Sequence, residues 1–267
     1  MRSSAPIAML RQYESRLAAD HELQYREDLK LRDIVRHFPS TTICRTGFPM
    51  TTAVGLDHRQ LLPPFLPVCR NQDGLFVATV KRIHPQGYFA HLPFALTHKP
   101  SDMRKNDPTW TSTRIAEQII EYIATWTEPP AQQGADMRCR SLGEYLVGIS
   151  YMREPDFEEM TRVLLLKRAT RFVKDCETLL ARYDGTPKFW ARDLCERIAE
   201  IRQATIRADF AVPSDLAALF SSEHIHEATQ ELIRKFGELL YWWPEVVKTT
   251  RALADGNVRF GKVISPN

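Results

Sequence analysis

The sequence PDFEEMTRVLLLKRATRFVKDCETLLARY, residues 155–183, decides the fold of the second half of the chain. Its apolar residues recur every three or four positions, as they do on the buried face of an amphipathic helix. These apolar residues are Met160, Val163, Leu164, Leu165, Phe172, Leu179 and Leu180. The stretch ends at Asp184-Gly185-Thr186-Pro187, where a glycine typical of a helix end precedes a proline typical of a helix start. The sequence therefore predicts one long helix over 155–183 with a sharp stop.

The same helical spacing continues on both sides of this stretch. Residues 188–208 form a second long pattern, and residues 222–252 form a third, which we expect to bend at Pro244. Upstream, a helix is predicted to start near Ser112. Its apolar stripe is Ile115, Ile119, Ile120 and Ile123. From Ser141 onward the pattern is helical almost throughout, after a loop over 128–135.

The first hundred residues are more mixed. Residues 6–38 read as helical, whereas 41–45 and 50–56 are short and rich in β-branched residues, which predicts strands. The segment LLPPFLP, residues 61–67, contains three prolines and predicts a rigid extended loop. A helix over 73–83 and a strand over 87–96, interrupted at a proline, complete this region.

A polar, proline-containing stretch between Lys99 and Pro108 is the expected boundary between the two halves. The predicted organisation is a helical segment over 1–40, a strand and loop segment over 41–107, and a helical domain over 108–267. The predicted fold class is therefore α+β, and mainly α.

Composition limits the functions that this chain can have. It has 267 residues, of which 43% are hydrophobic and 26% charged, and 36 basic against 33 acidic residues give a net charge of +3. These values exclude general disorder, and the charge excess is too small to predict nucleic-acid binding. Five scattered cysteines indicate a reducing compartment. Without a signal sequence or a run of about 20 apolar residues, we expect no transmembrane segment and a cytoplasmic location.

Polar residues of the types used in catalysis are concentrated between residues 54 and 100. They are Asp57, His58, Arg59, Arg70, Asn71, Asp73, His91 and His98. Loops held on a rigid scaffold are common places for reactive groups. Two of these residues also have a purely structural explanation. Asp73 could be the N-cap of the helix that follows it. Asp57 could form an ion pair with Arg59 at a surface turn.

The helical half contains two further patterns, and both favour a structural role. His224 and His226 lie two positions apart, which on a helix directs them about 200° away from each other, so they are not expected to share a metal ion. The aromatic run Tyr241-Trp242-Trp243 is explained by core packing or a helix–helix contact.

The segment GLDHRQLLPPFLPVCRNQDGLF, followed by YFAHLPFALTHKP, resembles the acceptor side of bacterial glycosyltransferases of the GT-A type related to family 2. Those sequences resemble GxDNRxLLPPFxPxxRNxDGxFG, followed by LPWALxHxP. This chain has His58 where the pattern has Asn, and Val77 where it has Gly. It contains no D-x-D, the acidic pair that usually binds the metal and the donor diphosphate, so it resembles the C-terminal part of such an enzyme or a shortened relative.

The resemblance implies a role for each matching residue. Asp73 would be the general base that deprotonates the acceptor hydroxyl, and His98 would be a ligand of a divalent metal, Mn²⁺ or Mg²⁺. Asp57 and Arg59 would line the acceptor side, while Arg70 and Asn71 would position the loop that carries the base.

Two functions follow from these observations. The first is transfer of a sugar from a nucleotide-sugar to a hydroxyl acceptor. The alternative is a non-enzymatic helical interaction or regulatory module, in which the helical half binds a protein partner; the missing D-x-D favours this second function.

Overall fold

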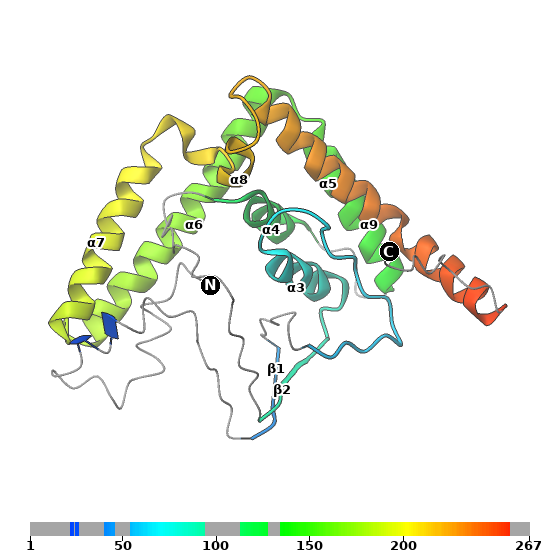
Figure 1. Ribbon diagram of the computed structural model, residues 1–267, viewed down its shortest axis with the longest axis horizontal. Coiled ribbons are helices and arrows are strands. Elements are labelled where there is room, and N and C mark those ends of the chain that lie inside the picture. The colour runs from blue at the N-terminus through cyan, green and yellow to red at the C-terminus, as the bar shows by residue number, and fades with distance from the viewer. Residues whose placement is uncertain are drawn as a thin grey trace, which may run out of the picture.

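The structure of the protein is a computed structural model, which describes residues 22, 23, 25, 26, 40–45, 54–93, 113–127 and 134–256. This part of the chain is mainly helical, with one small two-stranded sheet (Figure 1). The prediction of a mainly α fold is therefore confirmed. No helix in the described ranges is both long enough and apolar enough to cross a membrane.

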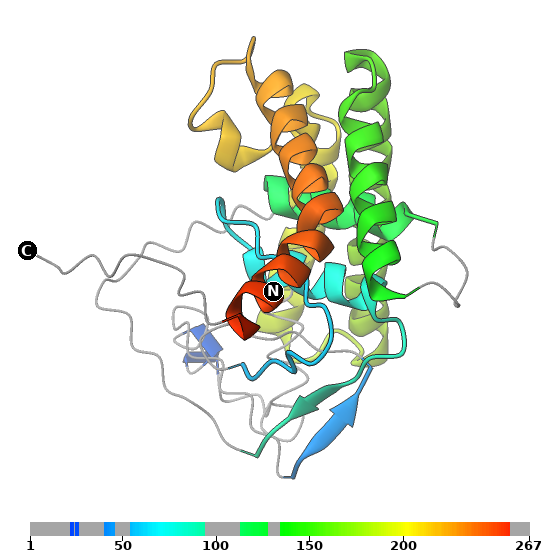
Figure 2. The ribbon, with the colours of Figure 1, turned by 90° about the vertical axis from the view of Figure 1, so that its right-hand side faces the viewer.

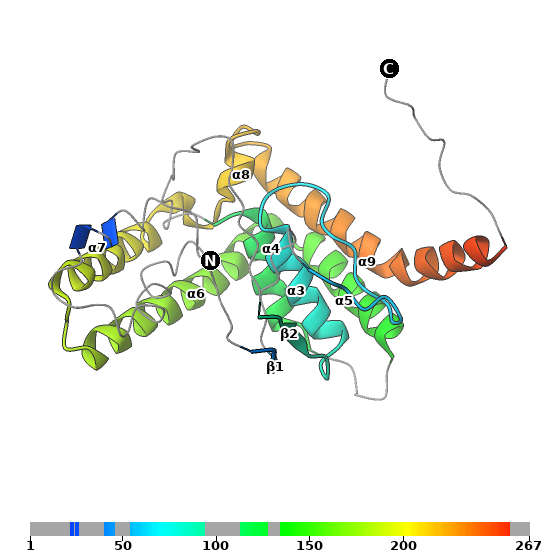
Figure 3. The ribbon, with the colours of Figure 1, turned by 60° about the horizontal axis from the view of Figure 1, so that its bottom comes forward.

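The elements follow one another in this order: β1 Thr42–Cys44, α3 Gln72–Ile83, β2 Phe89–His91, α4 Ile115–Thr125, α5 Ala135–Ser150, α6 Glu154–Arg182, α7 Lys188–Thr205, the 3₁₀ helix η3 Ala208–Ala211, α8 Ser214–Ala217 and α9 Ile225–Asp255. Helices α6 and α7 form one arm, and α5 and α9 form a second arm that diverges from it (Figure 1). Helices α3 and α4 lie between the arms, and the sheet lies beneath them, as the rotated views in Figures 2 and 3 also show.

The helix predictions agree closely with the structure. Helix α6 begins one residue before the predicted stretch, and α7 starts directly after the predicted stop. Pro244 lies inside α9, where the missing N–H interrupts the hydrogen-bond ladder. Val163 is an exception to the predicted buried face, because it is exposed on α6.

The strand predictions were less accurate. Strand β1 lies within 41–45 as predicted, but β2 covers only three of the seven described residues in the range 87–96, where a strand was expected. The antiparallel pairing explains this, because β1 offers only three partners, from Thr42 opposite His91 to Cys44 opposite Phe89. The described part of the other expected strand, residues 54–56, is not in a strand. Of the predicted helix over 6–38, the four described residues are helical, and the rest lies outside the described ranges.

One hydrophobic core joins the loop region to the helical half. Leu75 of α3, Ile119 of α4, Leu142 of α5 and Phe236 of α9 are all fully or almost fully buried in it. The proline-rich loop adds Leu61 and Leu66 to the same cluster. The predicted boundary near residue 107 lies outside the described residues, and this core contains residues from both sides of it.

A pair of glycines sets the distance between α5 and α9. A Cβ atom placed on Gly143 would lie 2.5 Å from the carbonyl oxygen of Gly237 and 2.6 Å from the backbone nitrogen of Tyr241. A Cβ placed on Gly237 would in turn lie 2.8 Å from the carbonyl oxygen of Gly143. The two backbones are in contact here, and only hydrogen fits at either position.

The cysteines differ in environment, and this predicts their reactivity. Burial raises the pKa of Cys139 to about 12 and that of Cys176 to about 11, whereas Cys195 is exposed. Because the thiolate is the reactive form, we expect 5,5′-dithiobis(2-nitrobenzoate) at pH 8 to label Cys195 rapidly, and Cys139 and Cys176 only after unfolding in urea. Mass spectrometry of the labelled peptides measures this order. Labelling of Cys139 at the rate of Cys195 in the folded protein would contradict the α5–α9 packing.

Candidate functional site

The proline-rich loop of the motif is packed against two helices. Leu61, Pro63, Pro64 and Leu66 are buried. Nε1 of Trp243 on α9 donates a hydrogen bond to the carbonyl oxygen of Leu62 at 2.6 Å. The prolines restrict the backbone of the loop, and the hydrogen bond holds the loop against α9. The loop is therefore a rigid support for the residues on either side of it.

The α3 side of the loop is held as firmly. The rings of Phe65 and Phe76 stack with centroids 4.1 Å apart and planes 7° from parallel. Nε2 of His84, just after α3, donates to the carbonyl oxygen of Leu61 at 2.6 Å. His84 was not among the candidate site residues, and its role in the structure is to fasten the loop to the end of α3.

Asp57 and Arg59 form an ion pair before this loop. The guanidinium of Arg59 donates from Nε to Oδ1 of Asp57 at 2.9 Å and from Nη2 to Oδ2 at 2.6 Å. These hydrogen bonds lower the pKa of Asp57 to about 2. The two side chains are highly exposed, so the pair contributes little to stability. The predicted surface ion pair is confirmed, and the predicted part in acceptor binding stays a prediction.

A strained turn leads into α3. Cys69 and Asn71 have φ values of 66° and 70°, in the left-handed region that non-glycine residues rarely adopt. The turn is closed by the side-chain amide of Gln72, which donates to the carbonyl oxygen of Cys69 at 3.0 Å. A Cβ placed on Gly74 would lie 2.5 Å from Oδ1 of Asn71, so the glycine leaves room for the Asn71 side chain.

This turn places Asp73 in the first turn of α3, partly exposed to solvent. Asn71, and not Asp73, is the N-cap residue, so the prediction of Asp73 as the cap was wrong. The reason lies in the left-handed Asn71, whose carbonyl oxygen already accepts a hydrogen bond from the backbone N–H of Leu75 at 3.1 Å. The Asp73 side chain instead lies in the first turn of α3, at the positive end of the helix dipole.

An open cavity of about 590 Å³ lies between the start of the motif loop, the start of α5 and the end of α9. Three basic side chains line it, Arg59, Lys248 and Arg251, together with Asp136 and Asp255. Nη2 of Arg251 also donates to the carbonyl oxygen of His58 at 2.8 Å, which ties the loop to α9. The cavity has an excess of one positive charge among these five groups.

The structure brings together some of the predicted site residues and separates others. Arg59 lines this cavity, whereas Arg70, Asn71 and Asp73 are not among its lining residues. Arg70 is exposed in the strained turn. His98, the predicted metal ligand, lies outside the described residues.

One cluster of residues of the types that bind metal ions was not predicted from the sequence. Glu154 and Glu158 on α6 lie beside His226 on α9, with one ligand atom of each within 4.8 Å of the others. His224 and His226 have different partners, because His224 bonds Ser221 at 2.9 Å and His226 lies 2.9 Å from Glu158. The spacing of Glu154 and Glu158 was visible in the sequence, but their proximity to His226 depends on how α6 and α9 pack.

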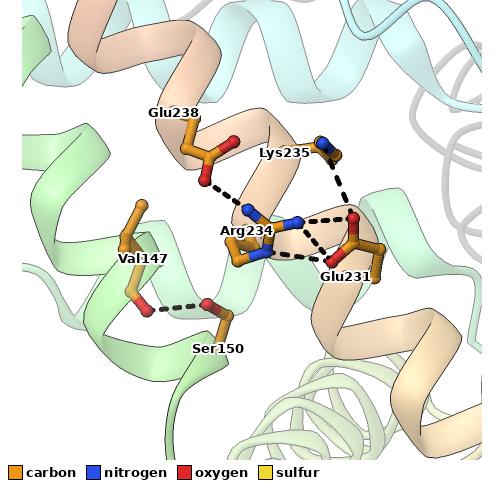
Figure 4. Close-up of polar contacts among 6 residues, drawn as sticks. All are labelled: Val147, Ser150, Glu231, Arg234, Lys235 and Glu238. Atoms are coloured by element: carbon orange, nitrogen blue, oxygen red, sulfur yellow. Dashed lines mark hydrogen bonds and ion pairs between the residues drawn. The ribbon is translucent and has the colours of Figure 1, made fainter.

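The charged side chains of the middle of α9 bind one another. Arg234 donates to Glu231 at 2.6 Å and also to Glu238, and Lys235 lies 3.7 Å from Glu231 (Figure 4). Such pairs three or four positions apart on an exposed helix face contribute modestly to helix stability. This face of α9 therefore has a structural role.

Comparison of the chain with known protein families, with curated proteins and with solved structures finds no match.

Proposed function

We propose that this chain provides the acceptor side of a glycosyl-transfer reaction, with Asp73 as the general base. The observation that carries the proposal is the strained turn before α3. Two left-handed non-glycine positions, Cys69 and Asn71, flank Arg70 shortly before Asp73. Strain of this kind persists where the surrounding structure enforces it and is concentrated at functional sites.

Two further features support the proposal. Trp243 holds the loop before the turn, and the Phe65–Phe76 stack joins that loop to α3, so the backbone on both sides of the turn is supported. Asp73 is also partly exposed, which leaves it accessible to a hydroxyl from solvent. A base needs both a fixed position and access to the proton that it removes.

In the proposed step, the acceptor O–H bond breaks and its proton passes to the Asp73 carboxylate. The acceptor oxygen forms a bond to the anomeric carbon of the donor sugar, and the bond from that carbon to the diphosphate oxygen breaks. The nucleoside diphosphate leaves with the electron pair, so donor and acceptor give a glycoside, a nucleoside diphosphate and one proton held on Asp73.

A divalent metal, Mn²⁺ or Mg²⁺, would stabilise the charge of the leaving diphosphate. The described residues of the motif do not form a ligand set for such an ion. The grouping that has the required proximity, Glu154, Glu158 and His226, contains no motif residue.

The variant Asp73→Asn tests the role of the base. We expect release of UDP or GDP from a panel of nucleotide-sugars, with Mn²⁺ and simple sugar acceptors, to fall by at least about 100-fold, the lower range for loss of a general base. The matched control is Asp156→Asn, which removes the same charge from the first turn of α6. Circular dichroism should show both variants folded. Equal activity of Asp73→Asn and the wild type, or no release by the wild type with any donor, would contradict the proposal.

A helical interaction module is the second candidate, and the end of α9 favours it. Trp242, Val246 and Leu253 are exposed there at 58%, 45% and 37%. Four and seven residues separate them, so they share one face of the helix. A nucleotide-sugar with Mn²⁺ should raise the thermal midpoint of a transferase, because a ligand that binds the folded state stabilises it. No shift at millimolar concentrations of UDP- and GDP-sugars would favour this second function.

A further inference from the structure

We infer that Glu154, Glu158 and His226 form a binding site for a single divalent transition-metal ion, with Zn²⁺ as the preferred occupant. The ion would join the start of α6 to the start of α9. This inference is independent of the proposed transferase function, since none of the three residues belongs to the motif.

The geometry of the three side chains suits one ion. Glu154 and Glu158 are four residues apart on α6, which places them on the same helix face. His226 is the second residue of α9. Their ligand atoms lie within 4.8 Å of one another, and Nε2 of His226 is 2.9 Å from Oε1 of Glu158. Small rotations of the exposed glutamate side chains would bring all three about 2 Å from a shared ion.

A second observation, independent of this cluster, comes from the cavity beside it. Glu158 and His226 line a small, partly open space together with Gln118 of α4, which is 1% exposed. Nε2 of Gln118 donates to the carbonyl oxygen of Ala211 at 2.7 Å. Its Oε1 has no hydrogen-bond donor among the described residues. A buried acceptor without a donor is costly, so a donor is expected in this space.

A metal-bound water would be that donor. The free volume of the cavity, about 10 Å³, is at the lower limit of what holds one water molecule. A cation held by Glu158 and His226 at the edge of the cavity would carry water in its open coordination positions. Such a water is polarised by the ion and would donate to Oε1 of Gln118.

The donor set indicates which ion would bind. One imidazole nitrogen and two carboxylates are common ligands of Zn²⁺, and Zn²⁺ binds nitrogen and oxygen sites more tightly than Mn²⁺ does. Mg²⁺ requires a nearly octahedral set of oxygen ligands and gains little from an imidazole. We therefore expect tight binding of Zn²⁺, weaker binding of Mn²⁺ and no binding of Mg²⁺ at the same concentration.

The position of the site gives the ion a structural consequence. Helix α6 belongs to one arm of the molecule and α9 to the other, and both begin where the arms meet (Figure 1). A bound ion would cross-link the arms at this point. Because metal binds only when the two helix starts are together, its binding stabilises the folded arrangement.

Titration of the full chain with ZnCl₂, after treatment with EDTA and removal of any affinity tag, tests the inference. Calorimetry should show one ion per chain, and the thermal midpoint should rise with Zn²⁺. His226→Ala and Glu158→Gln should each lower the affinity at least 10-fold. The matched controls are His224→Ala and Glu159→Gln, which remove the neighbouring histidine and glutamate of the same type and should bind as the wild type does.

Thermal midpoints measured in EDTA establish that the variants are folded without the metal. Three results would overturn the inference. These are no saturable Zn²⁺ binding by the wild type, unchanged affinity in His226→Ala, and an equal loss of affinity in His224→Ala and His226→Ala. The last result would show that zinc binds histidines at the surface without this site.

Discussion

Replacing Gly143 by alanine is expected to destabilise the protein by about 3 kcal/mol, at the upper end of the range for an overpacked core. The added methyl group would lie 2.5 Å and 2.6 Å from two backbone atoms of α9. Backbone atoms cannot rotate away as a side chain can, so α5 and α9 would have to separate along their contact. The free energy of unfolding in urea, followed by circular dichroism, measures the loss.

The matched control for this variant lies on the same helix. Gly148 is also within α5, but a Cβ placed there meets no atom within 4 Å. Because alanine has a higher helix propensity than glycine, Gly148→Ala should stabilise the protein by up to about 1 kcal/mol. The same substitution five positions apart is thus expected to have opposite signs. If both variants were stabilised, the close contact of α5 with α9 would be wrong.

Replacing Trp190 by alanine is expected to cost about 3–5 kcal/mol, the range for truncating a large buried aromatic residue. Trp190 is fully buried between α6 and α7, and its ring meets that of Tyr183 edge to face with centroids 6.0 Å apart. Its cluster contains Phe189, Leu194 and the buried Cys176 of α6. Removing the indole would leave a cavity at the centre of this arm.

Trp242→Ala is the control, because the same atoms are removed from a side chain that is 58% exposed. That variant should change the urea midpoint only slightly, whereas Trp190→Ala should lower it clearly. The thiol of Cys176 provides a second measurement, since the loss of packing around it should increase its labelling rate in the folded state. An effect of Trp190→Ala no larger than that of Trp242→Ala would contradict the packing of α6 against α7.

Helices α7 and α4 are each also tied to residues far away in the sequence. Tyr25 donates to Oδ2 of Asp193 at 2.9 Å, and Arg26 donates to both carboxylate oxygens at 2.9 and 3.0 Å. The backbone N–H of Ile115 at the start of α4 donates to Oδ1 of Asp215 at 3.0 Å. A helix start has backbone N–H groups without partners inside the helix. Here Asp215 of α8 supplies an acceptor for one of them.

The sequence by itself determined the local elements. The apolar spacing in residues 155–183, 188–208 and 222–252 predicted three long helices, because a helix repeats every 3.6 residues and one face must be buried. The prolines of residues 61–67 predicted the extended loop for an equally local reason. The helix after Asp73 was predicted one residue from its actual start. These features depend only on residues close to one another along the chain.

Only the tertiary structure decided which of these elements meet. The sequence could not show that Gly143 faces Gly237, that Trp243 holds the motif loop, or that His226 lies beside Glu158. The strand expected over 87–96 was predicted too long for the same reason, because the length of β2 depends on its partner strand. A contact between distant residues depends on how whole helix faces pack together, and a local pattern records only that a face is apolar, not what covers it.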